Sequence, residues 1–142
     1  NSLYKWIKNS LSNNKKIYLF DDVYFSPISI DTLVECTHQL IDLNMNGIYN
    51  IVGDERVSKK QFGLILASYY KLPSDLIVSA KINEYGLNTI RPLDMSLDNS
   101  KIKNVIRKKL DSINRSFETI DEAQKNGRQI ELNNSFRESF NE

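Results

Sequence analysis

The sequence has little of what builds crosslinks and metal sites. Cys36 and His38 are its only cysteine and its only histidine among 142 residues. One cysteine cannot form a disulfide within the chain, and this pair cannot supply the four ligands of a structural zinc site. Two positions apart on a predicted helix, they also do not face each other, which excludes a local thiolate–imidazole pair. We expect Cys36 in the core, His38 on the surface, and a protein of the reducing cytoplasm.

A strong charge of one sign and a long apolar run are also lacking. Nineteen Lys and Arg stand against 18 Asp and Glu, which leaves a net charge of +1. This balance indicates no nucleic acid partner and no attraction to an anionic membrane. No apolar run approaches the roughly 20 residues of a membrane-spanning helix, and no signal peptide is recognisable. We therefore expect a soluble protein without a membrane partner.

Glycine is scarce, and its scarcity excludes a complete dinucleotide site. The five glycines stand singly along the chain. A dinucleotide fold needs a glycine-rich turn between a strand and a helix, where backbone amides hold the pyrophosphate. The chain also begins at Asn1 rather than Met, and its apolar pattern starts at once at Leu3. We expect this chain to be part of a longer protein and to bind no dinucleotide alone.

The elements that are present alternate between helices and strands. Ser58 and Gln61 have the spacing of a capping box, and Val57 and Phe62 that of a hydrophobic staple, so a helix is predicted to begin there. Such alternation favours an α/β fold. Apolar spacing predicts helices over 3–11, 30–41 and 59–69, a helix capped within 98–100 that runs to 106, and one capped by Ser116 that runs to 123. Strands are predicted over 17–20, 48–52 and 76–78, the second of them buried.

Four motifs occur in an order and spacing that resemble the second half of the dTDP-4-dehydrorhamnose reductases. They are FDDVYFSPIS at 20–29, GIYNIVG at 47–53, SKKQF at 58–62, and IRPLDMSLD at 90–98. Each is common by itself, but the four together are specific. The resemblance covers about residues 1–106.

The resemblance implies both a fold and a function. The fold is the C-terminal substrate lobe of a Rossmann-type extended short-chain dehydrogenase/reductase, mostly helical with a few short strands. Residues 1–110 are expected to form the substrate-binding lobe, and residues 111–142 a C-terminal helix and tail. The intact parent would reduce a nucleotide-diphosphate sugar with NADP or NAD, which binds to a missing N-terminal Rossmann half. A homodimer of that parent, and an epimerase or dehydratase reaction on the same fold, stay open.

The resemblance also implies four substrate-binding residues. Arg91, in the Arg-Pro motif, would clamp the diphosphate, because a guanidinium forms two parallel hydrogen bonds to it. Asn1 would open the helix that meets the nucleotide or sugar. Ser26 and Pro27 would shape the wall of the lobe, or simply orient the helix that follows. No catalytic residue is expected in this chain.

Three further readings of the sequence compete with this one. Tyr4 and Lys8 have the Tyr-x-x-x-Lys spacing of a reductase active site, but the resemblance places Tyr4 in the helix after that site, where packing is expected. The protein could instead be a non-catalytic, regulatory relative. The basic stretch 101–109 favours a nucleic-acid binder only weakly, because it lacks interleaved aromatic residues.

Overall fold

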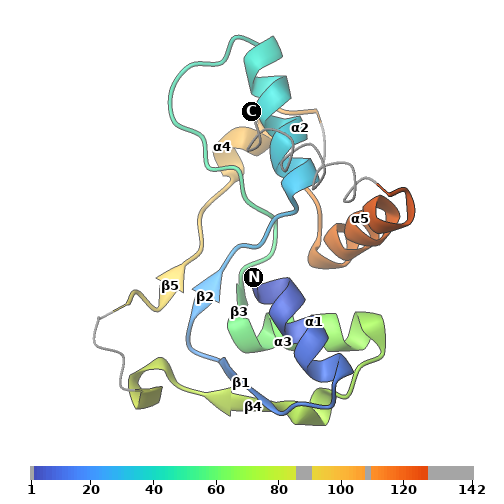
Figure 1. Cartoon of the computed structure of the whole chain (residues 1–142). Coiled ribbons are helices and arrows are strands. Elements are labelled where there is room, and N and C mark those ends of the chain that lie inside the picture. The colour runs from blue at the N-terminus through green and yellow to red at the C-terminus, as the bar shows by residue number, and fades with distance from the viewer. Residues whose placement is uncertain (1, 86–90, 108–109, 128–142) are drawn as a thin grey trace, which may run out of the picture.

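The computed structural model describes residues 2–85, 91–107 and 110–127, and Figure 1 shows their arrangement. The predicted mixed α/β fold, mostly helical with a few short strands, is confirmed. In chain order the elements are α1 (Leu3–Ser12), β1 (Ile17–Phe20), β2 (Tyr24–Phe25), α2 (Ile30–Asp42), β3 (Val57–Ser58), α3 (Lys59–Tyr70), a 3-10 turn at Ser74–Leu76, β4 (Ile77–Ala80), a second 3-10 turn at Ile82–Tyr85, β5 (Asp94–Met95), α4 (Ser100–Lys103) and α5 (Ile113–Lys125).

The strands form two small sheets, and each sheet pairs strands that are distant in the sequence. β1 pairs in parallel with β4, and this pair lies beside α1 and α3 at one end of the molecule (Figure 1). In the second sheet β2 is central, antiparallel to β3 and parallel to β5. This sheet lies between the first end and the opposite end, where α2 and α4 are found. It therefore joins two bodies with separate cores.

The larger core lies between α1, α3, α5 and the β1–β4 pair. Gly63 allows α3 to lie close to β1, because a Cβ there would come within 2.3 Å of Leu19 Cδ1. Phe117 of α5 is 2% exposed and stacks among aromatic rings of α1 and α3. Burial of each such side chain stabilises the fold by about 1.5–3 kcal/mol. The buried members are Ile7, Leu11, Ile17, Leu19, Val57, Phe62, Leu66, Ala67, Ile77, Ile113 and Phe117.

The smaller core lies between α2, α4 and the segment that follows α4. Cys36 is fully buried there and His38 is exposed, as expected. The buried members are Cys36, Ile102, Ile106 and Leu110, with Leu40, Tyr49 and Ile51 packed against them.

The predicted buried strand over 48–52 is wrong. The segment has no strand pairing, and Ile48 is 85% exposed. Its sequence has the β-branched and aromatic composition of a strand, but a strand needs a neighbour to take its backbone hydrogen bonds. The described residues offer only side chains to this backbone: Lys101 Nζ donates to the carbonyl of Ile48, and Asn99 Nδ2 donates to the carbonyl of Val52.

Two helix boundaries also differ from the prediction. α4 spans only Ser100–Lys103 and ends in a turn at Asn104, where the amide of Val105 donates to the carbonyl of Ile102. At its other end the side chain of Asn99 does not cap the helix but donates to the carbonyl of Gly53. α5 begins at Ile113 rather than after Ser116, since the Oγ of Ser112 accepts from the amide of Arg115 and so caps the first turn.

Among the described residues, no helix is long and apolar enough to cross a membrane. The same part of the chain holds no group of three or more His, Cys, Asp or Glu that could bind a metal ion. The division into residues 1–110 and 111–142 stays a prediction.

The capping box at Ser58 gives a test of the fold. Ser58 Oγ accepts from Gln61 N at 3.0 Å, and Gln61 Oε1 accepts from Ser58 N at 2.8 Å. We expect Ser58→Ala to lower the free energy of unfolding by about 1 kcal/mol, because an amide of the first turn of α3 loses its acceptor. Urea unfolding followed by circular dichroism measures it. Gln61→Glu keeps an acceptor for Ser58 N and should stay near the wild type; an unchanged Ser58→Ala midpoint would contradict the role of the cap.

Candidate functional site

A polar pocket of about 320 Å³ lies where the central sheet meets the start of α4. It receives groups from the end of β2, the loop before β3, and the segment from β5 to α4, so three chain segments distant in sequence build it. Its lining residues are Ser26, Gly53, Asp54, Arg56, Ser96, Leu97, Asp98 and Asn99.

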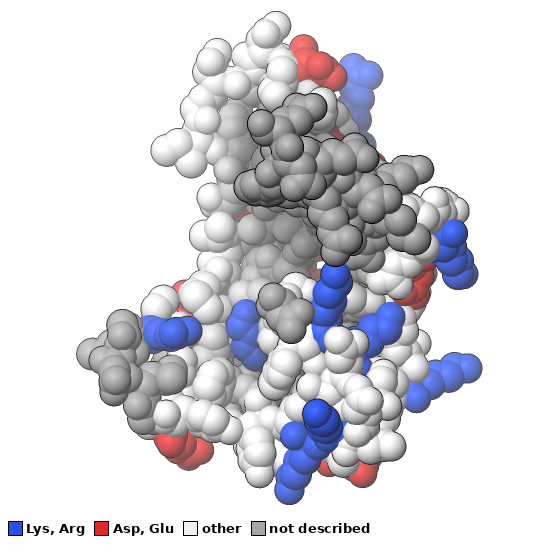
Figure 2. Space-filling model, viewed as in Figure 1, with Lys and Arg blue, Asp and Glu red and all other residues white. Residues whose placement is uncertain are grey.

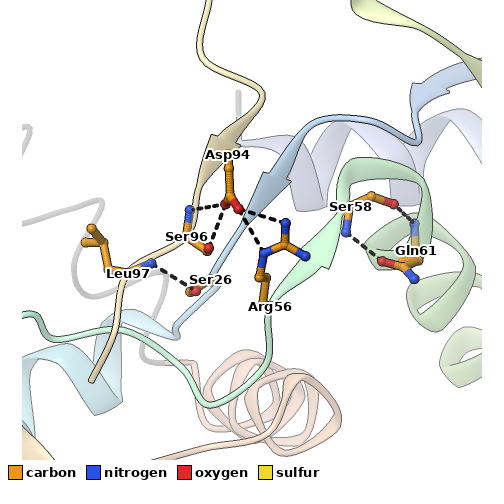
Figure 3. A network of polar contacts seen from close by, with 7 residues as sticks. All are labelled: Ser26, Arg56, Ser58, Gln61, Asp94, Ser96 and Leu97. Carbon is orange, nitrogen blue, oxygen red and sulfur yellow. Dashed lines mark hydrogen bonds and ion pairs between the residues drawn. The ribbon is translucent and has the colours of Figure 1, made fainter. Parts of the chain in front are cut away.

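An ion pair spans the central sheet at one side of this pocket (Figure 3). Arg56, just before β3, donates from Nε at 3.0 Å and from Nη2 at 2.7 Å to one carboxylate oxygen of Asp94 on β5. The guanidinium of Arg56 also lies 3.8 Å from the centroid of the ring of Tyr24, which belongs to the middle strand, β2. Stacking on an aromatic face and a double hydrogen bond are both preferred interactions of arginine. This ion pair, called the Arg56–Asp94 strap below, thus links the two outer strands of the sheet, β3 and β5, across β2.

The second oxygen of Asp94 is also occupied. It accepts from the amide of Ser96 at 3.0 Å and from its hydroxyl at 2.6 Å (Figure 3). The hydrogen bond from Arg56, followed by those from Ser96, holds the pKa of Asp94 well below its ordinary value. Asp94 is therefore a carboxylate at neutral pH, and Arg56 is already neutralised within the chain.

The floor of the pocket is a close backbone contact. A Cβ at position 53 would lie 2.0 Å from the carbonyl oxygen of Pro27, so only glycine fits there. Next to it, the amide of Leu97 donates to the hydroxyl of Ser26 at 3.4 Å. Through these contacts the end of β2 packs against the loop before β3 and against the segment from β5 to α4.

Asn99 fastens the loop before β3 from the other side. It is 8% exposed, and its Nδ2 donates to the carbonyl of Gly53 at 3.1 Å and to Asp54 Oδ1 at 2.9 Å. Lys103 Nζ meets the same Asp54 oxygen at 2.6 Å. All partners of Nδ2 are acceptors, which is consistent with this orientation of the Asn99 amide.

The structure brings together some of the residues expected from the sequence. Ser26 lines the pocket, and the carbonyl of Pro27 contacts the pocket floor. Arg91 is exposed, three positions before Asp94, and makes no hydrogen bond or ion pair with any other described residue. Asn1 lies outside the described residues.

The sequence alone missed the strap and the buried amide. Arg56 stands in no recognisable motif, and nothing local connects it with Asp94, 38 positions away. The Asp-x-Ser spacing of Asp94 and Ser96 is typical of a side chain that bonds a backbone amide two residues on, and this was the one available signal.

Tyr4 and Lys8 belong to a structural network. Lys8 Nζ donates to Tyr4 OH at 3.0 Å, Tyr4 OH lies 2.8 Å from Tyr70 OH, and Tyr70 donates to Asp121 at 2.8 Å. Burial, followed by the hydrogen bond with Tyr4, raises the pKa of Tyr70. Tyr4 itself is partly buried and packs against the larger core. The network instead links α1, α3 and α5.

Two lysines of the basic stretch 101–109 form contacts within the molecule. Lys101 donates to the carbonyl of Ile48 and lies 4.2 Å from the Tyr49 ring centroid, and Lys103 pairs with Asp54. On the face in Figure 2, the Lys and Arg side chains lie apart and form no continuous stripe. Lys108 and Lys109 lie outside the described residues.

The chain's own residues do not fit a dinucleotide cofactor. The glycines at 47, 53, 63, 86 and 127 are too far apart for a glycine-rich turn. Of those that the structure describes, Gly53 and Gly63 serve close packing against Pro27 and Leu19.

Comparison with known proteins assigns a family. Residues 1–124 match the family model described as the RmlD substrate binding domain. No curated protein sequence matches the chain.

Solved structures share the fold. A dTDP-4-dehydrorhamnose reductase from Bacillus anthracis in complex with NADP has a TM-score of 0.75 at 18% identity, over 84% of this chain and 42% of its own. A dTDP-4-dehydrorhamnose reductase from Clostridium acetobutylicum has a TM-score of 0.74 at 17% identity, over 87% of this chain and 44% of its own. A dTDP-glucose 4,6-dehydratase from B. anthracis in complex with NAD has a TM-score of 0.66 at 13% identity, over 89% of this chain and 40% of its own. The chain thus spans less than half the length of each.

The Arg56–Asp94 strap predicts a dependence of stability on pH. Because the pKa of Asp94 is lowered in the fold, its contribution is present above the unfolded value of 3.8 and is lost as pH falls through the folded value. We expect Asp94→Asn to lower the urea midpoint at pH 7, and the difference from the wild type to shrink progressively as pH falls below 3.8. A difference that stays constant over this range would contradict the assignment. Asp75→Asn, an exposed carboxylate away from the pocket, is the control.

Proposed function

The chain belongs to the family of RmlD substrate binding domains, and on that premise we propose that it is the nucleotide-sugar-binding part of an NAD(P)-dependent reductase. The observation that carries the proposal is the family match over residues 1–124, together with a polar pocket built from Ser26, which the motifs had already marked. The whole reaction is a proposal for the intact parent, because this chain spans only part of such enzymes.

We propose Arg91 as the clamp for the diphosphate. Of the two arginines close to the central sheet, Arg56 is neutralised by Asp94, whereas Arg91 is exposed and makes no ion pair with any other described residue. An arginine without an internal partner keeps its full donor set for a phosphate. Asn1, Ser26 and Pro27 complete the proposed contacts, with Ser26 and Pro27 at the pocket wall and floor.

This lobe would act by positioning. A nicotinamide cofactor would supply hydride from the absent half, and a general acid there would protonate the carbonyl oxygen of the sugar. The residues described here hold the ligand so that the reacting carbon meets that hydride, which is worth several orders of magnitude in rate. We propose that the chain alone is inactive.

Two other functions remain compatible with this role. The structural similarity to a dehydratase favours a wider class of nucleotide-sugar enzymes, with epimerases or dehydratases beside reductases. A regulatory relative would keep the binding lobe without the chemistry. We propose a cytoplasmic location, because the single cysteine is buried and the chain has no second one for an internal disulfide.

We further propose that the α2 end of the molecule packs against the absent N-terminal Rossmann half. Ile30, Val34 and Ile41 are 67, 46 and 65% exposed and form one stripe of α2 by their helical spacing. Ile48, in the segment that follows α2, is 85% exposed as well. The end formed by α2 and the segment after it is mostly uncharged on the face in Figure 2. An apolar stripe beside a strand-like segment without pairing is typical of an element that completes another core.

The Arg91 clamp is tested by calorimetric titration of dTDP, UDP and dTDP-glucose into the chain. We expect saturable binding that weakens at least about tenfold in Arg91→Ala, since a charged hydrogen-bonding group is lost. Arg115→Ala removes an arginine of α5 and should change nothing. Equal affinity of Arg91→Ala and wild type would remove Arg91 from the site, and absence of nucleotide binding would contradict the proposed function.

The apolar stripe is tested by sedimentation velocity over a range of concentrations. The wild-type chain should self-associate, because the stripe lacks its natural cover, and the double variant Val34→Lys, Ile41→Lys should stay monomeric. Tyr18→Lys, which places the same charge on a half-exposed residue of β1, should self-associate like the wild type. A monomeric wild-type chain would show that this surface needs no partner.

A further inference from the structure

Some polar atoms of the pocket-lining residues form hydrogen bonds within the chain, and others do not. Asp98 Oδ1 accepts from the amide and hydroxyl of Ser100, and Asp54 Oδ1 accepts from Asn99 and Lys103. In both carboxylates the second oxygen has no partner among the described residues. The same is true of Asn99 Oδ1. Three acceptor atoms of lining residues thus have no hydrogen-bond partner among the described residues.

Two donors accompany these acceptors. Arg56 uses Nε and Nη2 for Asp94, so its Nη1 has no acceptor among the described residues. Ser26 accepts from Leu97 through its oxygen, and within the same part of the chain its hydroxyl proton has no acceptor. The pocket therefore offers both kinds of hydrogen bond side by side.

The charge of the site argues against a phosphate. Among the described residues in and around the pocket are three carboxylates and two cations: Asp54, Asp94, Asp98, Arg56 and Lys103. The site therefore keeps one net negative charge, and both cations already touch a carboxylate. An anion would be repelled, whereas a neutral ligand would not.

We propose that this pocket binds the vicinal hydroxyls of a neutral sugar ring. A hydroxyl both donates and accepts, so adjacent hydroxyls can give protons to Asp98 and Asn99 while they accept from Arg56 and Ser26. A volume of about 320 Å³ accommodates one such ring. The proposal rests on the proposed function and refines it: Arg91 takes the diphosphate, and this pocket takes hydroxyls of either the pyranose or the ribose of the ligand.

The test is a titration of the 15N-labelled chain followed by amide shifts in NMR spectra. The probes are methyl glucopyranoside, UDP, dTDP and inorganic phosphate. The glucoside has adjacent pyranose hydroxyls and UDP has the 2′,3′-diol, whereas the deoxyribose of dTDP has no vicinal diol. We expect the glucoside, UDP or both to shift the amides of Gly53, Leu97 and Asn99. A response to the glucoside would show that the pocket binds the pyranose. A response to UDP but not to dTDP would show that it binds the ribose.

Asp98→Asn is the diagnostic variant, because it keeps the shape and the acceptor for Ser100 but turns the available oxygen into a donor. It should weaken the glucoside or UDP response about tenfold, while Asp75→Asn should leave it unchanged. The pocket assignment would be overturned if phosphate or dTDP shifted these amides as strongly as the glucoside or UDP does. It would also be overturned if neither the glucoside nor UDP shifted them. Nucleotide binding that depends on Arg91 without these shifts would leave the proposed function standing and remove only this inference.

Discussion

The contact between Gly53 and the carbonyl of Pro27 is the constraint on which the rest of the site depends. It brings the chain after β2 against the chain before β3, at the point where the two cores are joined, and no side chain at position 53 could be accommodated without moving backbone. The hydrogen bonds of Asn99 to the same loop hold it from the opposite side. The pocket exists because both contacts are satisfied at once.

The two ends of the molecule differ in how complete they are. The end with α1, α3 and α5 has a closed aromatic core, a capping box, and a hydrogen-bonded chain from Lys8 to Asp121 that links three helices. The end with α2 and α4 has few buried residues and keeps apolar side chains on its outer side. One core is thus closed within the described residues, whereas the other leaves apolar side chains exposed.

The electrostatics of the central sheet separate two arginines that look equivalent in the sequence. Arg56 is stacked on Tyr24 and neutralised by Asp94, so it links the strands of the sheet, and only its Nη1 has no acceptor among the described residues. Arg91 keeps its charge without a partner among the described residues. The two guanidinium groups therefore differ in local charge, although both stand in the sequence as single arginines outside the helices.

The sequence by itself determined the helices whose apolar faces and caps are local, such as α1, α2 and α3, and the family through motifs at fixed spacing. The resemblance to that family also pointed to Ser26, which lines the pocket. The strap of Arg56 and Asp94, the buried amide of Asn99 and the loss of the strand at 48–52 were decided only by tertiary structure. The physical reason is that each depends on partners far along the chain: a local pattern reports what a segment prefers, whereas pairing and packing decide whether a neighbour is there to satisfy it.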